Sequence, residues 1–118
     1  MRLLAAFVFA CTGGVAAAQE VASAPGAVLR ALDKVAGETT DIDIATGASA
    51  TFGRLTIALS DCRYPVDDPA ANAYAHMTIS DDQSAAILFD GWMVASSPAL
   101  SALDDPRYDV WVLRCKSE

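Results

Sequence analysis

Histidine, cysteine and phosphate-binding glycine motifs are scarce in this chain, and each scarcity argues against a class of chemistry. His76 is the single histidine, and only three cysteines are present. A zinc site takes three or four histidine, cysteine or carboxylate ligands, so the sequence predicts no metal centre. No Cys-x-x-Cys pair supports a redox role, and the scattered glycines form no phosphate-cradling loop. We therefore expect no cofactor.

Basic side chains are also few, and this limits the classes of partner that the protein can bind. The chain has 8 lysines and arginines against 15 aspartates and glutamates, a formal net charge of −7. Nucleic acids and anionic lipid headgroups repel such a protein, so the sequence predicts no nucleic-acid partner. The aspartate doublets at 67–68, 81–82 and 104–105 fall in expected turns. Aspartate is common there because it hydrogen-bonds nearby backbone, so the doublets give no support to paired-carboxylate catalysis.

No apolar run is long enough to cross a membrane, because a spanning helix needs about 20 residues. The run over residues 3–11 follows Arg2 and precedes small residues that end in alanines at 16–18. This layout is typical of a secretory signal peptide, and we expect residues 1–18 to be a leader cleaved after Ala18. A membrane anchor and a lipoprotein acylated at Cys11 are the alternatives, which the short, broken run and the bulky residue at 9 disfavour.

The composition behind the leader predicts one domain. Residues 19–27 are small and include Pro25 and Gly26, which predicts a flexible approach segment. Residues 28–118 contain no internal repeat and no low-complexity tract. A chain of about 100 residues suits a single core. We therefore expect one β-rich domain over residues 28–118.

Short alternating segments predict that this domain is all-β. Residues 39–45 alternate isoleucine with aspartate, and residues 73–80 alternate so that His76 faces solvent. Residues 28–33 and a hairpin over 49–59 with a Gly-Arg corner are predicted strands as well. A loop is expected at 63–72, because two prolines oppose both strand and helix. Six or seven strands predict a small antiparallel sandwich or partly closed barrel with one short helix.

Residues 87–115 include two strongly apolar segments. Residues 87–94 predict a strand with a bulge at Gly91. Residues 109–115 hold four consecutive apolar residues between charged ones, which predicts a central strand covered on both faces.

The serines between these strands have a structural and a chemical interpretation. Ser96 and Ser97 precede a proline, which predicts a helix of about two turns with Leu100 and Leu103 on one face. The alternative is a hydrolase or transferase that uses His76 with Ser96 or Ser97. No Gly-x-Ser-x-Gly elbow supports this alternative, so no catalytic residue is assigned.

Two cysteines, Cys62 and Cys115, remain once the leader is removed. An even number in an exported domain predicts a disulfide, and two free thiols or a thiol reserved for a partner are the alternatives. The chain-entropy model gives such a bond about 4 kcal/mol of stabilisation, an upper figure.

The aromatic residues supply the candidate binding side chains. An exposed tryptophan or tyrosine cluster would suit a glycan or a peptide. Trp92 and Trp111 are predicted in the core, as large apolar rings usually are. Tyr64 and Tyr108 are then the candidate surface binding residues.

A family resemblance rests on three sequence segments, FGRLTIALSDCRYP, FDGWMVASSPALSALDDP and YDVWVLRC. In this order behind a leader they resemble the Gram-negative bacterial family catalogued as domain of unknown function 2155, over residues 28–116. The family has no assigned reaction, cofactor or partner. The resemblance therefore implies no functional residues, only a small secreted envelope protein with paired cysteines. Residues 64–69 are acidic where family members often have a basic, proline-rich segment.

These observations predict a non-catalytic periplasmic protein that acts as a binding or interaction module of the cell envelope. Its expected partner is an envelope protein or a cell-wall component. The small periplasmic hydrolase or transferase is one alternative, and a purely structural role in the envelope is another.

Overall fold

The computed structural model describes residues 20–100, 102–103 and 105–117. Within these ranges the chain forms eight strands and one short 3-10 turn. They are β1 (Val21–Ser23), β2 (Gly26–Asp33), β3 (Glu38–Ala45), β4 (Ser49–Phe52), β5 (Leu55–Pro65), β6 (Tyr74–Asp81), β7 (Ile87–Val94), η1 (Pro98–Leu100) and β8 (Tyr108–Lys116). Every strand pairing is antiparallel, which confirms the all-β prediction.

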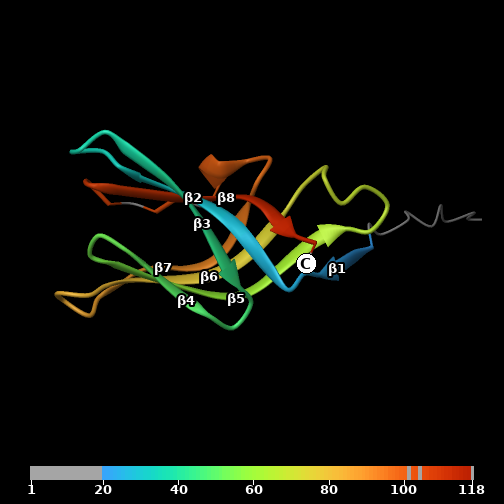
Figure 1. Cartoon of the computed structure of the whole chain (residues 1–118), viewed down its shortest axis with the longest axis horizontal. Helices are drawn as coiled ribbons and strands as arrows, with labels where there is room; N and C mark the ends of the chain where they lie inside the picture. The colour runs from blue at the N-terminus through green and yellow to red at the C-terminus, as the bar shows by residue number, and fades with distance from the viewer. Residues whose placement is uncertain (1–19, 101, 104, 118) are drawn as a thin grey trace, which may run out of the picture.

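The strands form two sheets that face each other as an open sandwich (Figure 1). One sheet has the order β1-β5-β6-β7, with β4 also on β5, and the other has the order β3-β2-β8. The long strand β5 pairs with β6 along one edge and with both β4 and β1 along the other. The sheets do not close into a barrel, so the sandwich form of the prediction is the correct one.

The chain passes between the sheets three times, and two of these crossings, from β1 to β2 and from β3 to β4, lie side by side. Thr46, which follows β3, donates its backbone amide to the carbonyl of Pro25 at 2.8 Å and its hydroxyl to the carbonyl of Ala24 at 3.0 Å. A Cβ at Gly26 would lie 2.5 Å from the carbonyl oxygen of Ile44, so only glycine allows the two chain segments to come this close.

The prediction of a flexible segment over residues 19–27 is wrong where the structure describes it. Val21–Ser23 pair with β5, and Ala24 and Ala27 are buried. The small residues that suggest flexibility are needed instead for close packing at the crossing.

The core lies between the two sheets and follows the alternation of the strands. Ile44 faces the core while Asp41 and Asp43 face solvent, and His76 lies on the outward face of β6. These predicted orientations are confirmed. The largest fully buried side chains include Leu29, Leu55, Ile57, Leu59, Met77, Ile79, Met93, Val110 and Val112.

A disulfide joins the two sheets. Cys62 in β5 is bonded to Cys115 in β8, with 5.7 Å between their Cα atoms. The predicted pairing is confirmed.

Four local predictions are wrong, each for a physical reason. The strand over Ile87–Val94 is regular at Gly91, and its bulge lies instead at Leu88, which has no partner in β6 between Ile79 and Ser80. β8 is an edge strand, since the strand order is β3-β2-β8, and Trp111 in its apolar run lines a cavity with Pro98 and Ala99 from the segment after β7. The predicted loop over 63–72 begins later, because β5 continues as far as Pro65. At Pro65 the strand no longer pairs with β6, so the amide hydrogen that proline lacks is not needed for a hydrogen bond to β6.

The predicted helix of two turns is the fourth. Among the described residues of this segment the structure has a single 3-10 turn, Pro98–Leu100, in which Leu100 is 77% exposed, while Leu103 is buried. The two leucines therefore do not share a helical face.

Candidate binding surface

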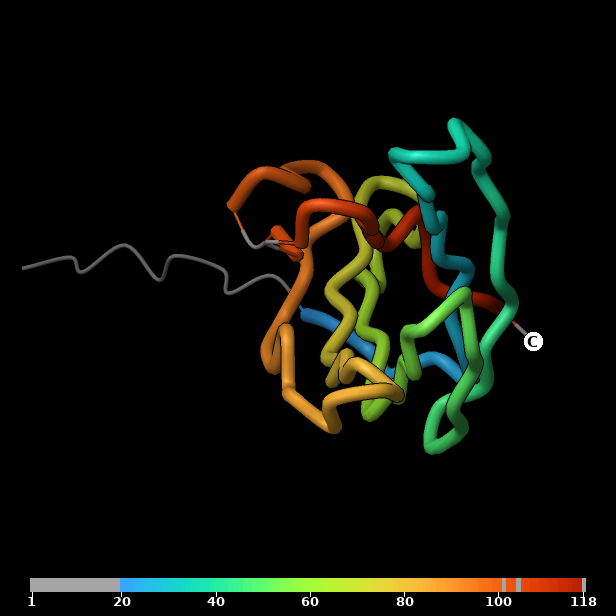
Figure 2. The backbone as a smooth tube through the Cα atoms, turned by 90° about the vertical axis from the view of Figure 1, so that its left-hand side faces the viewer, coloured from blue at the N-terminus to red at the C-terminus, as the bar shows by residue number. Residues whose placement is uncertain are grey.

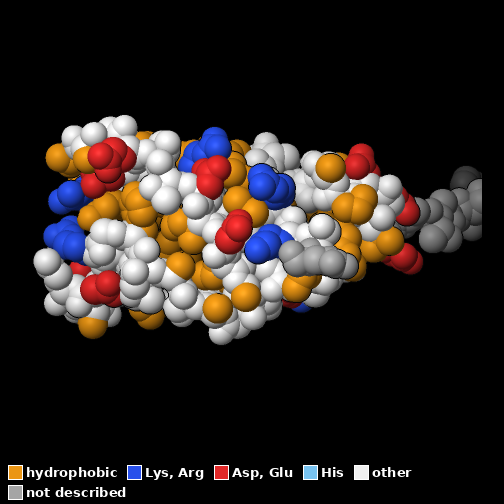
Figure 3. Space-filling view, in the orientation of Figure 1, with side chains coloured by type: hydrophobic (Ala, Val, Ile, Leu, Met, Phe, Trp, Pro, Cys, Tyr) orange, Lys and Arg blue, Asp and Glu red, His pale blue; other side chains and the backbone are white. Residues whose placement is uncertain are grey.

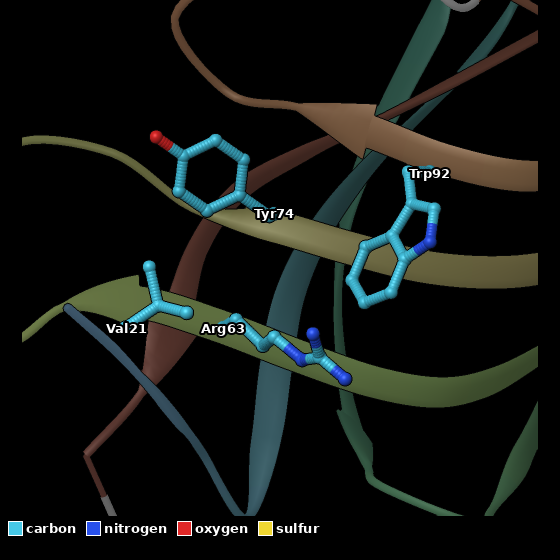
Figure 4. A pocket seen from close by; sticks show the side chains of 4 residues that line it. All are labelled: Val21, Arg63, Tyr74 and Trp92. Atoms are coloured by element: carbon cyan, nitrogen blue, oxygen red, sulfur yellow. The ribbon is translucent and has the colours of Figure 1, made fainter. Parts of the chain in front are cut away.

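Four neighbouring strands of the larger sheet each contribute one side chain to a shallow hollow on its outer face. These residues are Val21 from β1, Arg63 from β5, Tyr74 from β6 and Trp92 from β7, and we call their site the Trp92 hollow. Its volume is about 290 Å³. Figure 4 shows the two aromatic rings at one side, with Val21 and the long Arg63 side chain along the other. The hollow is thus mainly apolar, with one guanidinium group beside it.

The register of the strands explains why these residues meet. Arg63 lies opposite Tyr74, and His76 lies opposite Trp92. Side chains directly opposite each other in an antiparallel sheet share a face and lie close enough to touch. Residues two apart on one strand share that face too, so Tyr74 and Trp92 become neighbours.

Trp92 is 39% exposed, so its predicted place in the core is wrong. The neighbouring Met93 is 1% exposed and takes the inward position instead. Apolar residues at both positions hide the alternation in this part of the strand. The sequence nevertheless contains an indication of the correct face. Asp90 and Trp92 are two residues apart and therefore lie on the same face of the strand, and a charged residue in mid-strand indicates the face toward solvent.

Two basic side chains hold the indole ring of Trp92. The Arg63 guanidinium carbon lies 5.0 Å from the ring centroid, and the His76 ring lies 5.0 Å away at 47°. Arg63 also donates from Nε to the Asp61 carboxylate at 2.7 Å. A cation over an exposed aromatic ring contributes roughly 0.5–1 kcal/mol, which is enough to favour one orientation of the indole.

A polar rim surrounds the hollow. The Asp90 carboxylate accepts a hydrogen bond from the Thr78 hydroxyl at 3.2 Å, and His76 Nε2 lies 3.9 Å from it. On the other side, the Asn72 amide donates to the Tyr74 hydroxyl at 3.3 Å. The aromatic side chains are therefore positioned by polar neighbours before any ligand arrives.

Tyr108 and Tyr64, the predicted binding residues, lie elsewhere. Tyr108 is 2% exposed, so the prediction that it lies on the surface is wrong. As the first residue of β8 it points into the core, where its ring contacts Phe52 at 5.8 Å and its hydroxyl accepts from the Arg54 amide at 3.3 Å. Tyr64 is half-buried and lines a smaller pocket beside Cys115. Neither tyrosine lines the Trp92 hollow.

His76 and the two serines lie apart in the described structure. His76 contacts Trp92 and Asp90, whereas the Ser96 hydroxyl accepts a hydrogen bond from the Asn72 amide at 2.9 Å. No hydrogen bond joins His76 to Ser96 or Ser97 in residues 20–100. This geometry gives no support to a serine nucleophile with His76 as its base.

The carboxyl groups with displaced pKa values lie away from the hollow. Hydrogen bonds from Arg107 lower the pKa of Asp33, and hydrogen bonds from Arg30 lower the pKa of Asp41. The backbone amides of Gln83 and Ser84 lower the pKa of Asp81 in the turn after β6. All three are ordinary carboxylates stabilised in the charged form, and none is poised to act as an acid near neutral pH.

The described residues contain neither a metal-binding cluster nor a membrane-spanning helix. In the described part of the chain, no group of three or more histidine, cysteine, aspartate or glutamate side chains is arranged to hold a metal ion. The same residues include no helix long and apolar enough to cross a membrane.

Comparisons with known proteins give a family without an activity. Residues 27–115 match the family DUF2155, described as an uncharacterized protein conserved in bacteria. The uncharacterized protein RP359 of Rickettsia prowazekii (strain Madrid E) is 33% identical over 88 residues, which cover 72% of this chain and 57% of that protein. The chain thus spans little more than half the length of this relative, and no solved structure matches it significantly. The chain belongs to the DUF2155 family of bacterial proteins.

Proposed function

We propose that this protein is a non-catalytic binding module of the cell envelope and that it binds through the Trp92 hollow. The observation that carries the proposal is the exposure of Trp92 in a built setting, where four strands supply the lining and Arg63 and His76 flank the ring. Exposed tryptophan beside arginine is the composition that recurs at binding hot spots. A tryptophan whose role is only to fill the core would be buried, whereas Trp92 is part-exposed.

The periplasmic location is part of the same proposal. Two features support it, the N-terminal pattern of a secretory leader and the Cys62–Cys115 disulfide. Disulfides persist in oxidising compartments and are rare in the cytosol. Fractionation of cells and N-terminal sequencing test it, and we expect a periplasmic protein that begins at Gln19. A full-length protein in the cytosolic fraction would contradict it.

Site-specific crosslinking in cells tests the binding role. A photoreactive amino acid replaces Val21, which is 42% exposed and lines the hollow, or Val35, which is 75% exposed in the turn between β2 and β3. We expect one defined adduct from position 21 and none of the same mass from position 35. The adduct should disappear when Trp92→Ala is added and persist with Trp111→Ala, the matched control.

Two outcomes would count against this role. Equal adducts from positions 21 and 35 would show that the hollow is not selective. An adduct that survives Trp92→Ala would remove the tryptophan from the interaction.

A further inference from the structure

We infer that the partner is an extended segment of another protein that adds to the free edge of β7, with a basic residue opposite Asp90. This inference rests on the proposed binding role and names the class of partner. Among the described residues β7 pairs with β6 alone, and Figure 2 shows it at the margin of its sheet. Its eight residues, ILFDGWMV, therefore present one row of backbone donors and acceptors to an incoming strand.

From Phe89 to Val94, β7 pairs regularly with β6 and has no lysine, proline or bulge to protect its exposed edge. Natural edges carry lysine, proline or a bulge, which prevent pairing with another chain. β7 has no lysine or proline, and its bulge lies at Leu88, near the start of the strand and away from Asp90 and Trp92. Ile87 is 66% exposed on the same strand, and Trp92 is exposed near its other end. An added strand would cover these apolar side chains, and its residues near Trp92 would reach the rim of the hollow.

Asp90 gives the edge its charge preference. It lies in mid-strand on the outer face, and its side chain is 60% exposed. On the β6 side its partners are Thr78 and His76, so the side toward the free edge is open to an incoming cation. A side chain directly opposite on an added strand would have its Cβ roughly 5 Å away, within reach of an ion pair.

The overall charge argues against a second copy of this chain as the occupant. The chain has a net charge of −7, and Figure 3 shows no basic patch on the face in view, where acidic and basic side chains are interspersed. Two such chains repel each other as they approach. A strand from another protein with lysine or arginine at its centre would instead place an opposite charge beside Asp90.

A peptide titration with a charge swap tests the inference. The probe is a capped seven-residue peptide that alternates threonine and valine around one central lysine, and its counterpart carries glutamate there. We expect the purified mature protein to bind the lysine peptide about fivefold more tightly, the size of a cross-strand charge preference. Asp90→Lys should reverse this order. Asp43→Lys, the same charge change on the edge strand β3 of the other sheet, should keep the wild-type order.

Hydrogen exchange locates the peptide. Slower exchange confined to β7 amides on addition of the lysine peptide would support strand addition. Protection elsewhere, an unchanged order in Asp90→Lys, or no binding at millimolar peptide would overturn it. The two proposals can fail separately. The adduct from position 21 in cells can depend on Trp92 even if the relative affinity for the lysine and glutamate peptides does not change in Asp90→Lys. That result would leave the hollow in place and exclude the β7 edge.

Discussion

At the scale of single residues, Tyr108 anchors the turn between β4 and β5 to the core. Its ring packs edge-on against Phe52, and its hydroxyl accepts the Arg54 amide. Tyr108→Ala should lower the free energy of unfolding by about 3–5 kcal/mol, as for other buried aromatic rings. Urea denaturation measures this loss. Trp92→Ala is the comparison, and we expect it to cost less than Tyr108→Ala because the Trp92 ring is 39% exposed.

Equal losses in the two variants would contradict these assigned positions. Tyr108→Phe separates the ring from the hydroxyl, and it should cost only about 1 kcal/mol because one hydrogen-bond acceptor is removed.

Gly53 forms the turn directly above Tyr108. Its φ of 56° lies in the left-handed region, and a Cβ added there would overlap the Tyr108 hydroxyl. Gly53→Ala should therefore destabilise by roughly 1–3 kcal/mol through strain and overlap. Gly37→Ala is the matched control, since its φ is 70° and nothing lies within 4 Å of the added Cβ. Thermal denaturation should show the larger loss for Gly53→Ala, and the reverse order would contradict the packing of Tyr108.

At the scale of elements, an ion pair ties the end of β2 to the start of β8. Arg107 donates to the Asp33 carboxylate at 3.1 Å and lowers the pKa of Asp33. Because the folded pKa is depressed, this contribution to stability is complete above the ordinary pKa of about 3.9 and is lost as the pH falls through the folded value.

Arg107→Gln should raise the pKa of Asp33 toward its ordinary value and weaken the fall in stability below about pH 4. Carboxyl NMR titration measures the first effect. Arg30→Gln removes the partner of Asp41 and should leave Asp33 unchanged. An unaltered Asp33 titration in Arg107→Gln would contradict the assigned cause.

The disulfide ties β5 of one sheet to β8 of the other. The double variant Cys62→Ser, Cys115→Ser should lose about 4 kcal/mol at most, because the crosslink restricts the unfolded chain. Denaturation of the wild type with and without reductant should show the same difference. A variant as stable as the oxidised protein would contradict the role of the bond in holding the sheets together.

Strands could be predicted where alternation is clear, as at Ile44 and His76, because parity alone sets which face is buried. The assignment of strands to sheets could not, since it depends on pairings between residues far apart in sequence. β8 illustrates this. Its four consecutive apolar residues predict a strand in the middle of a sheet, yet β8 lies at the edge of the order β3-β2-β8. Trp92 is exposed and Tyr108 is buried, the reverse of the prediction, because the hydrophobicity of a side chain alone does not show which face of a strand it lies on.

At the scale of the whole molecule, the described part of this acidic chain presents the Trp92 hollow and the free edge of β7 on the same sheet. The two features meet at Trp92, which lines the hollow and belongs to the edge strand. Sequence composition indicated a binding module without catalytic machinery, but it could not place the surface. That surface exists only once β1, β5, β6 and β7 lie side by side.

The most direct test of a binding surface at Trp92 is fluorine NMR of the mature protein labelled with 5-fluorotryptophan. The chain has two tryptophans, so Trp111 on the other sheet serves as an internal control, and a Trp111→Phe variant assigns the two signals. On addition of soluble envelope extract, we expect the Trp92 signal to shift or broaden while the Trp111 signal stays in place. A change at Trp111 alone, or no change at either ring, would contradict the central claim.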